Sequence, residues 1–71
     1  MNEIAFMQVR LVRMAAEKWH KTTAECAAVF EEFHVYEYIE SLYELFHVQG
    51  DEADFEEIQA YLEKQGAKIL S

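Results

Sequence analysis

Every histidine of this chain stands three residues after a glutamate, in the words "EKWH" at 17–20, "EEFH" at 31–34 and "ELFH" at 44–47. On a helix, this spacing puts a carboxylate and an imidazole on one face, which is how four-helix bundles hold carboxylate-bridged metal pairs. The pattern raises the hypothesis of a helical metal-binding protein. Such a site requires ligands that converge on one interior point, so the hypothesis depends on the helices that position them.

The composition predicts an all-α fold. The chain has 71 residues, 52% of them apolar, with no proline and only two glycines, and no stretch alternates apolar and polar residues as a strand does. This length allows one domain with a thin core. We expect a compact bundle of four short helices over residues 1–66, followed by a short tail over 67–71. The expected helices cover residues 3–21, 23–33, 35–48 and 52–65.

Local signals predict where these helices begin and end. The word "TTAE" predicts a capping box in which Thr22 and Glu25 close the start of the second helix. The apolar register slips near His34, which predicts a break there, although one bent helix over 23–48 is an open alternative. Gly50 is expected to close the third helix in the left-handed conformation, and Asp51 to cap the fourth.

The first helix has more apolar surface than a small bundle is expected to cover. Val9, Val12, Ala16 and Trp19 form a second apolar flank, and the large ring of Phe6 falls on the polar side. We therefore expect a second copy, as in a homodimer, or a different protein to lie against this helix. The candidate partner-binding residues are Phe6, Val9, Arg10, Arg13, Trp19, Tyr36 and His47.

The same periodicity argues against the metal site. Ile39 and Phe46 mark the buried side of the third helix, which directs Glu44 and His47 away from the core, while His34 falls in the suspected break. We expect neither a metal nor a cofactor. His47 lies near a helix end, where it is expected either to cap the last carbonyl groups or to contact a partner.

Charge indicates the kind of partner. The net charge is −8, and between residues 22 and 63 twelve carboxylates meet no lysine or arginine. Such a surface repels phosphate groups and attracts basic partners. We keep a small helix-turn-helix-like DNA-binding regulator as the alternative function. Its recognition helix would, however, carry Glu37, Glu40 and Glu44 into the major groove.

No arrangement of residues predicts an enzyme. Cys26 lies on an apolar helix face, and no histidine has an evident reason to lie beside it as a base. A lone cysteine excludes an internal disulfide, and the first residues carry no basic leader. We therefore expect a cytoplasmic protein without a membrane-spanning segment.

The stretch "YIESLYELFHVQGDEADFEEIQAYLEKQ" at 38–65 resembles a family of short bacterial proteins catalogued as domain of unknown function 3791. The matching positions are Tyr38, Ile39, Tyr43, His47, Gly50, Asp51 and the stripe of Ile58, Tyr61 and Leu62. Two positions depart from the pattern, since Phe46 replaces the commoner leucine and Val48 a small polar residue.

The resemblance supports the helical fold and implies no established activity. Family members are similar to proteins often encoded beside ADP-ribosyltransferase-like toxin domains, which implies an antitoxin-like or accessory role. Our expectation is a non-enzymatic protein-interaction module that binds such a toxin domain or associates with itself.

Overall fold

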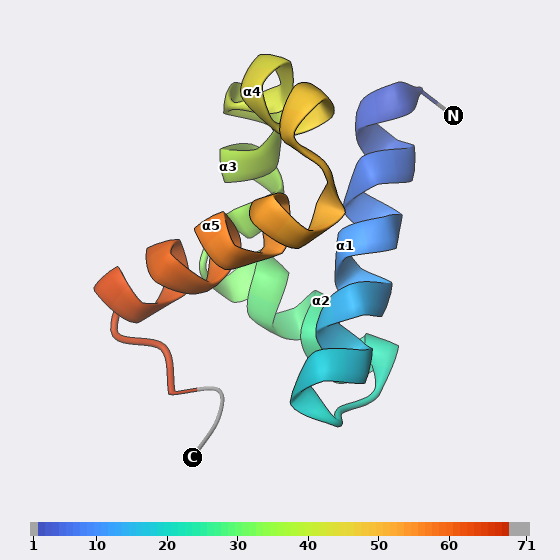
Figure 1. Cartoon of the computed structure of the whole chain (residues 1–71). Helices are drawn as coiled ribbons and strands as arrows, with labels where there is room; N and C mark the ends of the chain where they lie inside the picture. The colour runs from blue at the N-terminus through green and yellow to red at the C-terminus, as the bar shows by residue number, and fades with distance from the viewer. Residues whose placement is uncertain (1, 69–71) are drawn as a thin grey trace.

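The computed structural model describes residues 2–68, which form helices and turns and contain no strand (Figure 1). The expected all-α class is confirmed, but this part of the chain has five helices rather than four. The helices are α1 (Glu3–Trp19), α2 (Thr23–Glu32), α3 (Val35–Ser41), α4 (Tyr43–Gln49) and α5 (Asp51–Lys64).

The extra helix arises because the predicted third helix is divided at Leu42. This residue leaves helical geometry, with φ −110° and ψ 18°, and separates α3 from α4. Just before it, the Ser41 hydroxyl donates a 2.9 Å hydrogen bond to the Tyr38 carbonyl oxygen. A serine that bonds the backbone in this way competes with the helix ladder, which favours a helix end.

The predicted start of α2 and the predicted break after it are both confirmed. Glu25 N–H donates to the Thr22 hydroxyl at 3.0 Å, while the Glu25 carboxylate accepts from Thr22 N–H at 2.9 Å. His34 takes left-handed backbone angles between α2 and α3, with φ 59° and ψ 34°. The alternative of one bent helix over 23–48 is therefore wrong.

At the next boundary, Gly50 closes α4 as its C-cap, as expected, but Asp51 is not the cap of α5. Gly50 itself is the N-cap of α5, and Asp51 is the first residue inside the helix. Gly50 has φ 90° and ψ 158°, which is not the left-handed helical conformation but a region that only glycine adopts readily. The turn thus requires glycine for a different reason from the one predicted.

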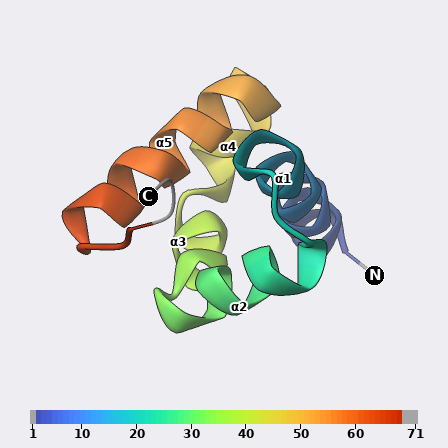
Figure 2. The same ribbon diagram turned by 90° about the horizontal axis from the view of Figure 1, so that it is seen from below.

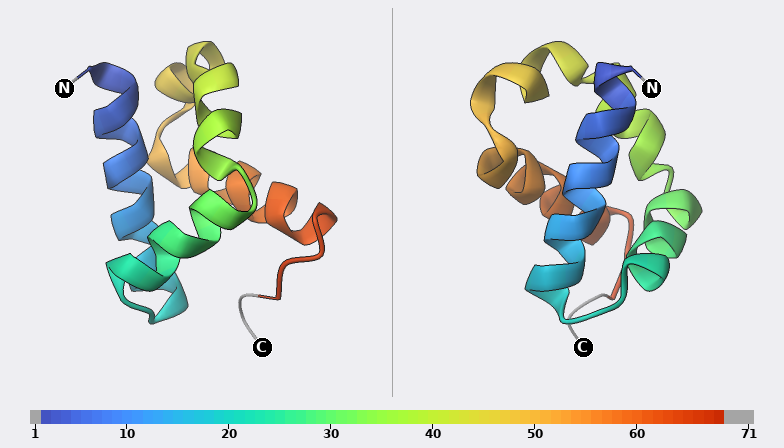
Figure 3. Two further views of the ribbon diagram at one scale, coloured as in Figure 1. Left: turned by 180° about the vertical axis from the view of Figure 1, so that it is seen from behind. Right: turned by 90° about the vertical axis from the view of Figure 1, so that its right-hand side faces the viewer.

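The five helices enclose one core. α1 packs against α2, α3 and α5, while α4 joins α3 to α5 at the end of the molecule near the start of α1 (Figures 1 and 2). Figure 3 shows α1 running along one side of the other helices. Each helix contributes at least one core residue. The core consists of Met7, Leu11, Val12, Ala15, Trp19, Cys26, Phe30, Val35, Ile39, Phe46, Phe55, Ile58 and Leu62.

The last described residues follow α5 closely. Ala67 N–H donates to the Leu62 carbonyl oxygen at 3.0 Å, and the Ala67 side chain packs against the core. The rest of the predicted tail, residues 69–71, lies outside the described residues. Across residues 2–68, no helix has the length and apolar character needed to cross a bilayer.

Candidate partner-binding site

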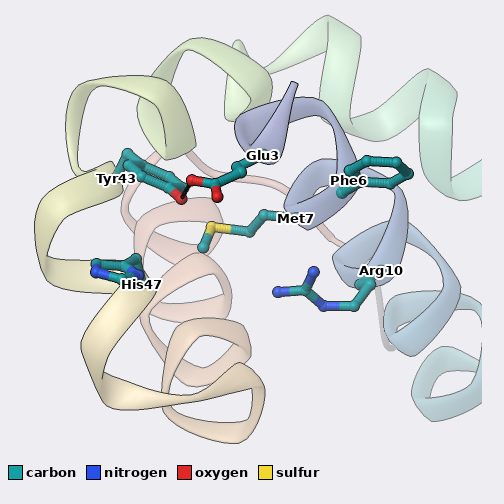
Figure 4. Close-up of a pocket in the computed structure, with 6 residues that line it drawn as sticks. All are labelled: Glu3, Phe6, Met7, Arg10, Tyr43 and His47. Atoms are coloured by element: carbon teal, nitrogen blue, oxygen red, sulfur yellow. Dashed lines mark hydrogen bonds between the residues drawn. The ribbon is translucent and has the colours of Figure 1, made fainter. Parts of the chain in front are cut away.

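An open cleft lies between the first half of α1 and the helix α4. Its volume is about 390 Å³. Figure 4 shows that four of its side chains come from α1 and two from α4. The lining residues of this α1–α4 cleft are Glu3, Phe6, Met7, Arg10, Tyr43 and His47. The structure thus brings together three of the predicted partner-binding residues, Phe6, Arg10 and His47.

Two stacked rings form the α4 wall of the cleft. The rings of Tyr43 and His47 are nearly parallel, with 14° between their planes and 5.5 Å between their centroids. They meet because residues four positions apart on a helix lie one above the other. The His47 ring, in the last turn of α4, therefore faces the ring of Tyr43, the first residue of the helix. Tyr43 was absent from the predicted site, although its spacing from His47 is a readable signal.

A hydrogen bond joins the two walls of the cleft. The Tyr43 hydroxyl donates to Oε2 of Glu3 at 2.9 Å (Figure 4). This bond raises the pKa of the Tyr43 phenol, because the nearby carboxylate disfavours a second negative charge. Glu3 was also missing from the predicted site, and no local signal connects it to a residue so distant in the chain.

Arg10 is held at the α1 edge of the cleft by an ion pair with α5. Its Nε lies 3.1 Å from Oδ2 of Asp51, and its Nη2 lies 3.3 Å from Oδ1. Such a two-bond pair fixes the orientation of the guanidinium. Both side chains are substantially exposed, so the pair contributes little to stability.

Beside the cleft, α1 exposes a mixed apolar and basic surface. Phe6 is 54% exposed and Val9 is 40% exposed. Arg13 is also exposed, and it lies on the same side of α1 because residues three and four apart share a helix face. We call Phe6, Val9, Arg10 and Arg13 the α1 face. All four are residues that the sequence pattern predicted to bind a partner.

The other two candidate residues lie elsewhere. Trp19 is only 6% exposed, and its ring packs against those of Phe30 and Phe55 at centroid distances of 6.3 and 5.6 Å. It is a core residue and not a surface anchor, so we remove it from the site. Tyr36 is half-buried against Phe30, with ring centroids 5.6 Å apart.

Tyr36 also lies away from the α1 face. Its carbonyl oxygen accepts a 3.0 Å hydrogen bond from Nε2 of Gln8. Gln8 follows Phe6 by two positions and so points about 160° away from it around the helix. The expectation that α1 leaves its whole second flank to a partner is corrected in the same way, because Val12 as well as Trp19 is buried within the chain.

The three histidines do not converge. His20 ends α1 and His34 precedes α3, both exposed and both in left-handed conformation, which histidine adopts more readily than most residues. His47 lines the cleft. His34 Nδ1 lies 3.6 Å from a carboxylate oxygen of Glu37, which follows it in the chain and is not the glutamate of its Glu-x-x-His motif. Within residues 2–68, no group of three histidine, cysteine, aspartate or glutamate side chains is arranged to hold a metal ion.

Two further polar side chains are buried. Cys26 lies in the core as predicted, and burial raises the pKa of its thiol, which disfavours the reactive thiolate. Asp54, in the first turn of α5, is fully buried. Its Oδ1 accepts a 3.0 Å hydrogen bond from Nε2 of Gln49, whereas Oδ2 meets no donor among the described residues. Burial raises the pKa of Asp54.

Comparison with known protein families agrees with the resemblance seen in the sequence. The model of a family described as protein of unknown function (DUF3791) matches residues 6–65. The chain belongs to the DUF3791 family. The match includes most of α1 together with α2, α3, α4 and α5, so the family pattern covers nearly the whole fold. Neither a search of curated proteins nor a search of solved structures found a match.

Proposed function

We propose that this member of the DUF3791 family is a non-enzymatic interaction module that binds a different protein through the α1 face and the α1–α4 cleft. The observation that carries the proposal is the exposure of Phe6 and Val9 at the edge of a cleft. A large exposed ring beside a concave, partly charged surface is typical of an interface anchor.

Charge favours a different protein over a second copy. Two copies with a net charge of −8 repel each other, whereas a partner of net positive charge is attracted to the chain as a whole. The family resemblance makes an ADP-ribosyltransferase-like toxin domain the first partner to test, with this chain as an antitoxin-like or accessory protein. The proposed setting is the bacterial cytoplasm, because a chain with one cysteine needs no oxidising compartment.

The proposal is tested by co-expressing the chain with the protein encoded beside it and measuring complex formation by size-exclusion chromatography with light scattering. Phe6→Ser is expected to weaken the complex by about tenfold or more, because it removes an aromatic anchor that the complex would bury. Val48→Ser is the matched control, since Val48 is 72% exposed and does not line the cleft. A chain that stays monomeric in the presence of its neighbour, or equal effects of the two substitutions, would contradict the proposal.

A further inference from the structure

The α1–α4 cleft is lined by one carboxylate, that of Glu3, for which the described residues offer no ion-pair partner. Arg10 is its basic lining residue, but two hydrogen bonds commit that guanidinium to Asp51, which lies outside the cleft lining. Among the described residues, the side chain of Glu3 accepts a hydrogen bond only from a neutral phenol, that of Tyr43. A carboxylate has about four acceptor positions on its two oxygens, so Glu3 retains capacity for a further donor.

The Tyr43 phenol reports the same negative field. Its pKa is raised first by the hydrogen bond to Glu3, and the charges of Glu3 and Glu44 raise it further. Arg10 acts in the opposite direction with a smaller effect. The group that favours a cation is the Glu3 carboxylate itself, which lines the cleft and keeps acceptor positions beyond the bond from Tyr43.

The remaining walls of the cleft suit a side chain with an apolar stem and a flat head. Phe6 and Met7 offer apolar surface from α1, and the rings of Tyr43 and His47 stand opposite on α4 (Figure 4). A guanidinium group stacks on aromatic rings and bonds a carboxylate through a planar fork. A lysine ammonium group matches this combination less well, because it is compact and strongly hydrated.

We propose that the α1–α4 cleft receives an arginine side chain of the partner protein, an inference that rests on the proposed function. The guanidinium of that arginine binds the Glu3 carboxylate, and its methylene stem lies against Phe6 and Met7. The partner surface is then basic at the centre of the contact and apolar where it meets Val9.

The test uses the full chain labelled with ¹⁵N and two small probes, N-acetyl-arginine methylamide and its neutral analogue N-acetyl-citrulline methylamide. Titrations of both probes are followed by two-dimensional NMR at one fixed pH. The arginine probe is expected to shift the amide signals of residues 3–10 and 43–47 saturably, with at least about fivefold higher affinity than the citrulline probe. Glu3→Gln should remove this preference. Glu17→Gln, which neutralises another exposed α1 carboxylate outside the cleft lining, should retain it.

Equal affinities for the two probes, or shifts located outside the cleft, would overturn the arginine assignment. This comparison on the unmodified chain decides the question even if Glu3→Gln alters the fold. The result also separates the two proposals. If Phe6→Ser abolishes the protein complex while the probes are not distinguished, the interaction module stands and only the arginine assignment fails.

Discussion

The Tyr43 hydroxyl bonds the Glu3 carboxylate at 2.9 Å, joining α4 to the first turn of α1 across 40 positions of the chain. This contact joins the two walls of the α1–α4 cleft. Because Tyr43 also stacks on His47, the bond positions both rings of the α4 wall. An exposed hydrogen bond contributes little to stability, so the main consequence of this contact is for the arrangement of the side chains that line the cleft.

Replacing Glu3 with glutamine is expected to lower the pKa of the Tyr43 phenol. The Glu3 carboxylate accepts a hydrogen bond from the phenol and so stabilises its neutral, protonated form, and this effect is lost with a neutral amide. The pKa of each tyrosine is measured by NMR titration of its ring signals. Tyr36 is the internal control, because burial is the main cause of its raised pKa. An unchanged Tyr43 pKa would show that the contact is absent in solution.

The buried carboxyl group of Asp54 is expected to make stability depend on pH. Burial raises its pKa in the folded state above the ordinary value of 3.8, so folding favours the protonated form. Its contribution to stability is therefore fully present below the unfolded pKa and is lost as the pH rises through the folded pKa. The ionised form of Asp54 is less favourable to the fold than the protonated form.

Comparison with Asp54→Asn isolates this effect from the other carboxylates. The free energy of unfolding is measured with urea for both chains between about pH 7 and about pH 4. On acidification, the unmodified chain is expected to gain stability relative to Asp54→Asn. Glu56→Gln is the control, since it removes an exposed carboxylate from the same helix. A pH-independent difference between the unmodified chain and Asp54→Asn would contradict the raised pKa.

Much of the fold could be predicted because its signals are local. The capping box of Thr22 and Glu25 lies within four residues, and the break at His34 is visible as a slip of the apolar register. The division at Leu42 was missed because leucine is a good helix former. The nearby signal was Ser41, whose hydroxyl bonds the backbone.

The candidate site was only partly predictable, for the opposite reason. Helical periodicity shows that Phe6 and Val9 lie on the outer side of α1, but it does not reveal which helices approach Trp19. Phe30 of α2 and Phe55 of α5 both reach that ring, so the chain covers it without help. The cleft likewise depends on a long-range contact between α1 and α4 that no periodicity contains.

Gly50→Ala is expected to lower the free energy of unfolding by about 1–3 kcal/mol, because the backbone at this turn adopts angles that only glycine tolerates. The space around a Cβ atom is open, so the cost is conformational and not steric crowding. Urea unfolding measures the loss. A chain of 71 residues is accessible to chemical synthesis, and D-alanine at position 50 should retain most of the stability. Equal losses with the two alanine enantiomers would contradict this cause.

The central claim is that the α1 face contacts a different protein. Site-specific photo-crosslinking tests it most directly, in cells that express the neighbouring gene. Benzoyl-phenylalanine replaces Phe6 in one chain and, as the control, the more exposed Val48 in another. If the α1 face contacts a different protein, we expect a discrete adduct with that protein from position 6 and not from position 48. The claim is contradicted if position 6 gives no adduct, gives only a dimer of this chain, or gives the same adducts as position 48.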